Sequence, residues 1–251
     1  MINEPFAVGN SRIHQLEPRV KVTFATIYSF VVALSSQFSV LLAAVFLSLL
    51  LVRIAGLNFW KVAKRLAVIN GLILFLWLVL PLTFEGEPLL NLGPLTVTRP
   101  GVILSAQITL KSNAILLVII SLIATMSLAT LGHALNHLRI PEKIVHLLLM
   151  TYRYIFVIEF EYLRLIRAAR IRGFRPVTNM HTYKTYAYFI GMLFVRAAAR
   201  AERVCQAMQC RGFKGKFYCL QEFPKSRENW IFSMLMSAVI IGLVICNILA
   251  V

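Results

Sequence analysis

Two carboxylates stand close together near the middle of the chain, at Glu159 and Glu161. A pair of acidic side chains can act as general acid and general base. However, Arg164 follows Glu161 by three residues, a spacing that brings side chains together on one face of a helix. The pattern therefore favours ion pairing over catalysis, and a membrane-embedded enzyme is the less favoured alternative.

Histidines and cysteines raise the question of a metal site. His133 and His137 are four residues apart, and His146 follows them, so the three imidazoles could bind a transition metal. Their place at an expected helix end favours an interpretation as polar boundary groups. None of the four cysteines forms a Cys-x-x-Cys pair, which leaves little support for zinc. We therefore expect no metal site and no cofactor.

The tripeptide Arg-Gly-Phe occurs twice in the most charged part of the chain. The two motifs are Ile171-Arg172-Gly173 and Cys210-Arg211-Gly212, each followed by Phe. Gly after Arg is typical of a helix C-terminus, where Gly adopts a left-handed conformation. The planar guanidinium of Arg also pairs well with carboxylates. The motifs are therefore either two ordinary helix caps or two equivalent docking points for a partner.

The composition of the chain indicates a membrane protein with basic cytoplasmic segments. The chain has 251 residues, of which 59% are hydrophobic and 14% charged, with a formal net charge of +16. Soluble domains average about 25% charged residues. The excess of Lys and Arg is typical of cytoplasmic loops in membrane proteins, and it makes nucleic-acid binding the weaker interpretation. No phosphate-binding Gly-x-x-x-x-Gly-Lys-Ser/Thr motif is present.

Apolar runs predict five membrane spans. Residues 22–52 are too long for one span, and Ser35-Ser36-Gln37 predicts a turn between two short helices, which keeps both flanking basic clusters on the cytoplasmic side. The other spans are residues 67–84, 101–131 and 230–251. A Pro- and Gly-rich external loop is expected over residues 85–100. We expect Lys111, inside the fourth span, to reach the outer interface near Arg99.

A basic segment separates the fourth span from the last. Residues 139–228 hold 17 Lys and Arg against 6 Asp and Glu, too much charge to cross a membrane. Helical periodicity predicts two long helices, one ending at Gly173 and one over about residues 182–211. The predicted organisation is an all-α, polytopic membrane protein. Its parts are an N-terminal segment with four spans (1–138), a cytoplasmic domain of long helices (139–228) and the last span (229–251).

Three stretches resemble the transmembrane T component of energy-coupling factor transporters, and most closely its cobalt-transport branch, the CbiQ type. They are MTYRYIFVIEFEYLRLIRAARIRGF (150–174), QAMQCRGF (206–213) and SRIHQLEPRVKV (11–22). The resemblance extends over nearly the whole chain. The family often has Ala-Arg-Gly in both paired motifs, whereas this chain has Ile171 and Cys210 at the first position.

The resemblance implies a non-catalytic subunit that passes ATP-driven motion to a substrate-binding membrane protein. The implied partners are two CbiO-like ATP-binding-cassette ATPases and an S component that is CbiM-like, with or without a small CbiN-like subunit. The two Arg-Gly motifs, residues 171–173 and 210–212, would dock into the ATPases. The implied location is the cytoplasmic membrane of a bacterium or archaeon, with the N-terminus in the cytoplasm.

An apolar stripe on the first long helix is the expected contact surface for the S component. Flexible Met and Leu side chains suit a partner that must slide. The stripe consists of Leu147, Leu148, Met150, Tyr154, Ile155, Tyr162 and Leu165. Cobalt is the expected substrate, and nickel or a vitamin is the alternative, because the T component does not itself contain the selective pocket.

Overall fold

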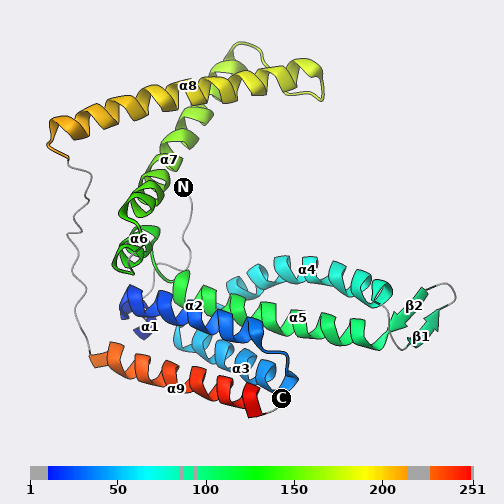
Figure 1. The fold of residues 1–251 in the computed structure, drawn as a ribbon. Helices are drawn as coiled ribbons and strands as arrows, with labels where there is room; N and C mark the ends of the chain where they lie inside the picture. The colour runs from blue at the N-terminus through cyan, green and yellow to red at the C-terminus, as the bar shows by residue number, and fades with distance from the viewer. Residues whose placement is uncertain (1–10, 85–87, 93–94, 139, 214–226, 250–251) are drawn as a thin grey trace. The chain divides into compact units, whose positions relative to one another are not determined.

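A computed structural model describes residues 11–84, 88–92, 95–138, 140–213 and 227–249. The chain forms two compact units. Among the described residues, the larger unit comprises those up to Ala134 and those from Arg227 onward, and the smaller unit comprises those from Leu135 to Phe213. The larger unit contains the apolar helices (Figure 1). These are α2 (Pro18–Leu34), α3 (Phe38–Ile54), α4 (Phe59–Thr83), α5 (Arg99–Val118) and α9 (Arg227–Leu249), with the short α1 (Arg12–Gln15). The π-helical turn η1 (Ile119–Ile123) directly continues α5.

Three helices are long and apolar enough to cross a membrane in the described part of the chain: α4, α5 continued by η1, and α9. Helices α2 and α3 have 17 residues each, or roughly 25 Å at 1.5 Å per residue. This is shorter than the hydrocarbon core of about 30 Å. The predicted turn between them is confirmed, because α2 ends at Leu34 and α3 begins at Phe38.

Two polar side chains of α5 hold the end of α2 and the turn that follows it. The Lys111 ammonium donates to the Ala33 carbonyl at 3.0 Å, and the Gln107 amide donates to the Ser36 carbonyl at 2.7 Å. The last carbonyls of a helix have no partner within that helix, and a bilayer offers no water to replace one. Lys111 therefore has a protein partner in the α2–α3 hairpin, which the sequence did not indicate.

The core of the larger unit lies among α2, α3, α5 and α9. Tyr28 is fully buried there, and its hydroxyl donates to the Ala44 carbonyl at 2.7 Å. Small residues let the helices approach closely, as is usual for helices packed in a membrane. The buried core residues from these helices include Ala25, Val32, Leu41, Ala44, Ala114, Val118, Met236 and Ile240.

Helix α9 runs parallel to α2. Near its start, Asn229 accepts a hydrogen bond from the Glu17 amide at 3.0 Å; near its end, Asn247 accepts one from Ser35 at 3.2 Å. Since Glu17 precedes α2 and Ser35 follows it, both helices begin at the same face of the unit.

Two sequence predictions for this unit need correction. Residues expected as an irregular loop contain an antiparallel hairpin of β1 (Pro88–Leu92) and β2 (Leu95–Thr98), with Leu92 opposite Leu95. The run Thr96-Val97-Thr98 explains β2, because β-branched residues favour strands. The all-α class is otherwise confirmed.

The fourth apolar helix also ends earlier than expected. It stops at Ile123, and a new helix, α6 (Leu128–His137), begins within the residues assigned to that span. The Ser127 hydroxyl accepts from the Thr130 amide at 3.2 Å, which is the arrangement of a helix N-cap. Ser127 therefore starts α6 despite the apolar residues that follow it.

The smaller unit contains two long helices, α7 (Glu142–Ile171) and α8 (Met180–Cys210). With 30 and 31 residues, each is roughly 45 Å long. Pro141 precedes α7, and the Asn179 side chain accepts from the Met180 amide at the start of α8. The smaller unit includes residues from Leu135, whereas the basic domain was predicted to begin at residue 139. The boundaries of that domain stay a prediction.

Candidate functional site

Both Arg-Gly-Phe motifs end their helices with the same hydrogen-bonding pattern. At the end of α7, the Phe174 amide donates to the Ala169 carbonyl at 3.0 Å, and the Gly173 amide donates to the Arg170 carbonyl at 3.0 Å. Gly173 has a φ of 84°. These two bonds and the left-handed Gly constitute a Schellman motif.

The end of α8 repeats this arrangement. The Phe213 amide donates to the Met208 carbonyl at 3.0 Å, the Gly212 amide donates to the Gln209 carbonyl at 2.9 Å, and Gly212 has a φ of 74°. The two ends therefore share sequence, backbone conformation and hydrogen bonds. We call residues 171–174 and 210–213 the Arg-Gly-Phe ends.

The guanidinium groups at these ends are available for a partner. Arg172 and Arg211 are exposed, and neither makes an ion pair or a side-chain hydrogen bond with the residues that the structure describes. Ile171 is 87% exposed and Cys210 is also exposed. Packing within the described unit therefore makes little demand on the position before each Arg, which explains how Ile and Cys can both occupy it.

The Phe of each end packs on the opposite helix. The ring centroid of Phe174, which follows α7, lies 6.0 Å from the ring centroids of Tyr186 and Phe189 on α8. Phe213, after α8, lies 6.0 Å from the His146 ring near the start of α7. Burial lowers the pKa of His146, so the folded state favours its neutral form. Each exposed Arg thus stands beside an aromatic contact that fixes the direction of its helix end.

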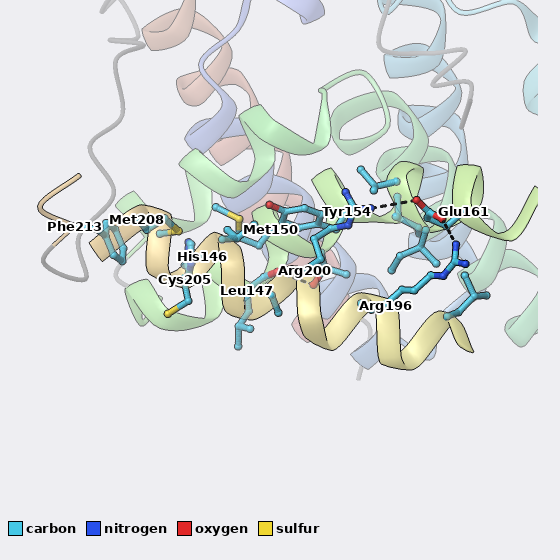
Figure 2. Close-up of a pocket in the computed structure, with 18 of the residues that line it drawn as sticks. His146, Leu147, Met150, Tyr154, Glu161, Arg196, Arg200, Cys205, Met208 and Phe213 are labelled. Atoms are coloured by element: carbon cyan, nitrogen blue, oxygen red, sulfur yellow. Dashed lines mark hydrogen bonds and ion pairs between the residues drawn. The ribbon is translucent and has the colours of Figure 1, made fainter. Parts of the chain in front are cut away.

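An apolar groove of about 680 Å³ lies between α7 and α8 (Figure 2). Four predicted S-component contacts line it: Leu147, Met150, Tyr154 and Ile155. The other three, Leu148, Tyr162 and Leu165, are partly buried but do not line the groove. We use the name α7–α8 groove for this surface.

Helix α8 supplies the opposite wall of the α7–α8 groove, and no prediction from the sequence covered this wall. Its lining residues recur every three or four positions, the period of one helix face. The same periodicity is present in the sequence, but Arg196 and Arg200 interrupt the run of apolar residues, so the face does not stand out as apolar. The wall includes Leu193, Ala197, Ala201, Val204 and Met208, together with Arg196 and Arg200.

Glu161 closes one end of the groove through ion pairs, as Figure 2 shows. Arg196 Nη1 lies 2.9 Å from Glu161 Oε2, Arg200 Nη2 lies 3.3 Å from Oε1, and Arg164 Nη1 lies 3.4 Å from Oε1. The predicted pairing with Arg164 is confirmed. The two closer contacts come from α8 and hold the helices together, which gives the carboxylate a structural role. We call these four residues the Glu161 cluster.

The candidate metal ligands do not assemble into a site. Among the described residues, no group of three His, Cys, Asp or Glu side chains could hold a metal ion. His133 and His137 lie on α6, whereas His146 packs on Phe213 and lines the α7–α8 groove. Cys219 lies outside the described residues, and Cys246 is on α9. The spacing of His133, His137 and His146 in the sequence therefore does not correspond to a cluster of metal ligands among the described residues.

Fold and site together define an all-α membrane protein in which a separate pair of long helices ends in two matched, exposed arginines. The family described as CbiQ, cobalt transport protein, matches residues 9–219, and the chain belongs to this family. The energy-coupling factor transporter transmembrane protein EcfT of Leuconostoc gelidum subsp. gasicomitatum is 27% identical over 83% of this chain and 82% of its own length.

Other relatives include proteins named EcfT and a protein named CbiQ. EcfT of Bacillus subtilis is 24% identical over 86% of this chain and 85% of its own length. The cobalt transport protein CbiQ of Salmonella typhimurium is 24% identical over 64% of this chain and 75% of its own length. The chain is thus a T component of an energy-coupling factor transporter, and the resemblance inferred from its motifs is confirmed.

Proposed function

We propose that this chain couples two ATPase subunits to a substrate-binding membrane S component during cobalt uptake. The observation that carries the proposal is the pair of matched Arg-Gly-Phe ends. Phe174 packs on the first turns of α8 and Arg211 follows its last turn, so the two arginines are separated by roughly 40 Å along that helix. Two equal ends at this separation suit a dimer with two equivalent binding sites.

Each Arg-Gly-Phe end is well suited to bind an acidic groove. A guanidinium offers several donors in a planar fork and forms bidentate hydrogen bonds with carboxylates. The Schellman motif reverses the chain directly after Arg172 and Arg211, which leaves each side chain at the extremity of its helix. The acceptor on each ATPase is therefore proposed to be a cleft with one or more carboxylates.

Motion of the ATPases would reach the membrane through α7 and α8. Closure of the ATPase dimer on ATP moves the two sites toward each other, and a helix with intact backbone hydrogen bonds moves as a rigid element. Because the Glu161 cluster and both Phe contacts join α7 to α8, displacement of either Arg-Gly-Phe end changes the position of both helices.

The α7–α8 groove is the proposed contact for the S component. Apolar side chains such as Leu147, at 64% exposure, and Ile155, at 44%, would otherwise face water. Met150 and Met208 can adapt to different packing arrangements, which suits a partner that changes orientation. The proposed occupant is an apolar helix of the membrane-embedded S component.

The proposed orientation places the N-terminus and the basic unit in the cytoplasm. Parallel α2 and α9 begin at the same face, in agreement with five crossings and an external C-terminus. The region 139–228, with its excess of Lys and Arg, would then lie on the side where such residues concentrate. The proposed location is the cytoplasmic membrane of a bacterium or archaeon.

A double replacement of Arg172 and Arg211 by Ala tests the coupling role. The complex would be reconstituted in vesicles, and cobalt uptake and ATP hydrolysis would be measured together, with nickel as the alternative substrate. We expect normal membrane insertion, because both arginines are exposed, and loss of ATP-dependent uptake. Arg175→Ala, an exposed Arg beyond the first cap, is the matched control. Normal uptake by the double variant would contradict the proposal.

A further inference from the structure

We infer that Glu161 is a positioning residue that sets the spacing between α7 and α8 and thereby makes the two Arg-Gly-Phe ends move together. The inference rests on the proposed coupling function. It concerns a residue for which the sequence indicated only a local pair with Arg164.

The Glu161 cluster joins residues that are far apart in the chain. Glu161 and Arg196 are 35 residues apart, and Glu161 and Arg200 are 39 residues apart. The Glu161 side chain is only 15% exposed, whereas those of Arg196 and Arg200 are 48% and 39% exposed. One partly buried carboxylate thus connects the middle of α7 to α8, with its two oxygens divided between different arginines.

Charge explains why this carboxylate differs from an ordinary surface ion pair. Exposed single pairs contribute little to stability, but three guanidinium groups that converge on one site repel each other unless an anion lies among them. Loss of the Glu161 charge would leave Arg164, Arg196 and Arg200 close together without the carboxylate that all three contact. Their repulsion would push α8 away from α7 at this point.

The position of the cluster along the helices gives this separation a functional consequence. Figure 2 shows Glu161 and Arg196 at one end of the α7–α8 groove, with His146 and Phe213 at the other. The Phe174 contacts join the helices beyond Glu161, at the end of α7. The cluster is the ion-paired link between the helices in the interval that separates these two aromatic contacts, and its loss would weaken the connection there. Displacement of one Arg-Gly-Phe end would then be absorbed by bending of the pair.

Spin-label distances in the full chain provide the direct test. Labels on Phe160→Cys and Ala198→Cys, both at exposed positions on either side of the cluster, report the spacing between α7 and α8. The four native cysteines would be replaced by Ser in every sample, so that their effect cancels. We expect Glu161→Gln to broaden the distance distribution and shift its mean outward. An unchanged distribution would overturn the inference.

Rescue and control variants separate charge from general damage. Arg196→Gln added to Glu161→Gln removes one repelling charge and should move the distribution back toward that of the native sequence. Glu161→Asp keeps the charge and should keep the distribution narrow. Glu202→Gln neutralises an exposed acid of α8 that has no ion pair among the described residues, and it should change nothing. A lack of rescue by Arg196→Gln would contradict the charge explanation.

Activity of the assembled complex completes the test. With native cysteines, Glu161→Gln should retain both ATPases, because both Arg-Gly-Phe ends are intact. Uptake per ATP hydrolysed should fall about tenfold or more, the factor expected for loss of a hydrogen bond between charged groups. Unchanged uptake per ATP would overturn the inference. If the native chain failed to bind ATPases, the proposed function would fail instead, and the label distances would still decide the role of Glu161.

Discussion

The left-handed glycines of the two Arg-Gly-Phe ends allow a quantitative prediction. A Cβ added at Gly173 or Gly212 would meet no atom within 4 Å, so Ala causes no steric clash at either position. The remaining cost is that of the backbone, since φ is 84° and 74°. A left-handed conformation costs an L-residue about 1–2 kcal/mol relative to Gly. Ala should therefore destabilise each Schellman motif by about this amount.

This cost should weaken ATPase binding if the motif positions the preceding Arg. A penalty of about 1–2 kcal/mol lowers the ratio of correct to incorrect helix ends by about 5- to 30-fold, and the apparent affinity falls by up to the same factor. The assay is a titration of purified ATPases against the chain in nanodiscs, for Gly173→Ala and Gly212→Ala separately. Asn at these positions should lose less, because Asn tolerates the left-handed region better.

Gly191 provides a matched control for the same chemical change. It lies within α8, and its added Cβ also meets nothing within 4 Å. Ala is favoured over Gly in a helix by about 1 kcal/mol, so Gly191→Ala should stabilise α8 and preserve ATPase affinity. Equal affinities for the variants of Gly173, Gly212 and Gly191 would refute the idea that the left-handed caps position Arg172 and Arg211.

Two further predictions concern Lys111 and His146. Lys111→Met removes the donor to the Ala33 carbonyl and should lower the free energy of unfolding by about 1.5–3 kcal/mol, seen as a lower melting temperature in detergent; an unchanged value would show that this contact is not stabilising. Because burial lowers the pKa of His146 in the folded state, its stabilising contribution is present above its usual pKa and declines as pH falls below about 6.5. The melting temperature should therefore fall more on acidification in the native chain than in His146→Gln, whereas equal falls would contradict the lowering of the His146 pKa by burial.

Local patterns predicted the ends of the long helices well. Arg followed by Gly at the end of a helical pattern indicates a helix C-terminus, and α7 and α8 end at Ile171 and Cys210 in agreement with it. The turn at Ser35-Ser36-Gln37 was also predicted from a local interruption in an apolar run. The N-cap at Ser127 was not predicted, although Ser is a preferred N-cap residue, because the surrounding apolar residues dominated the pattern.

The α7–α8 groove could be predicted only in part. Leu147, Met150, Tyr154 and Ile155 lie on one face of α7, and helical periodicity alone identifies such a face. Periodicity does not say how far along the helix a partner extends, and Leu165, which does not line the groove, stays a predicted contact. The residues of α8 that complete the groove depend on how two helices pack, which no single-helix pattern contains.

The sequence by itself determined the membrane class, the apolar helices, the two capped ends and the short-range pair of Glu161 with Arg164, because each follows from composition or from neighbours within a few residues. Only the tertiary structure decided that Glu161 binds Arg196 and Arg200, that Phe213 packs on His146 and that Lys111 holds the end of α2. Such contacts join residues separated by many turns of chain. Their partners are selected by the packing of whole helices, so the residue types alone leave many pairings equally compatible with charge and hydrogen bonding.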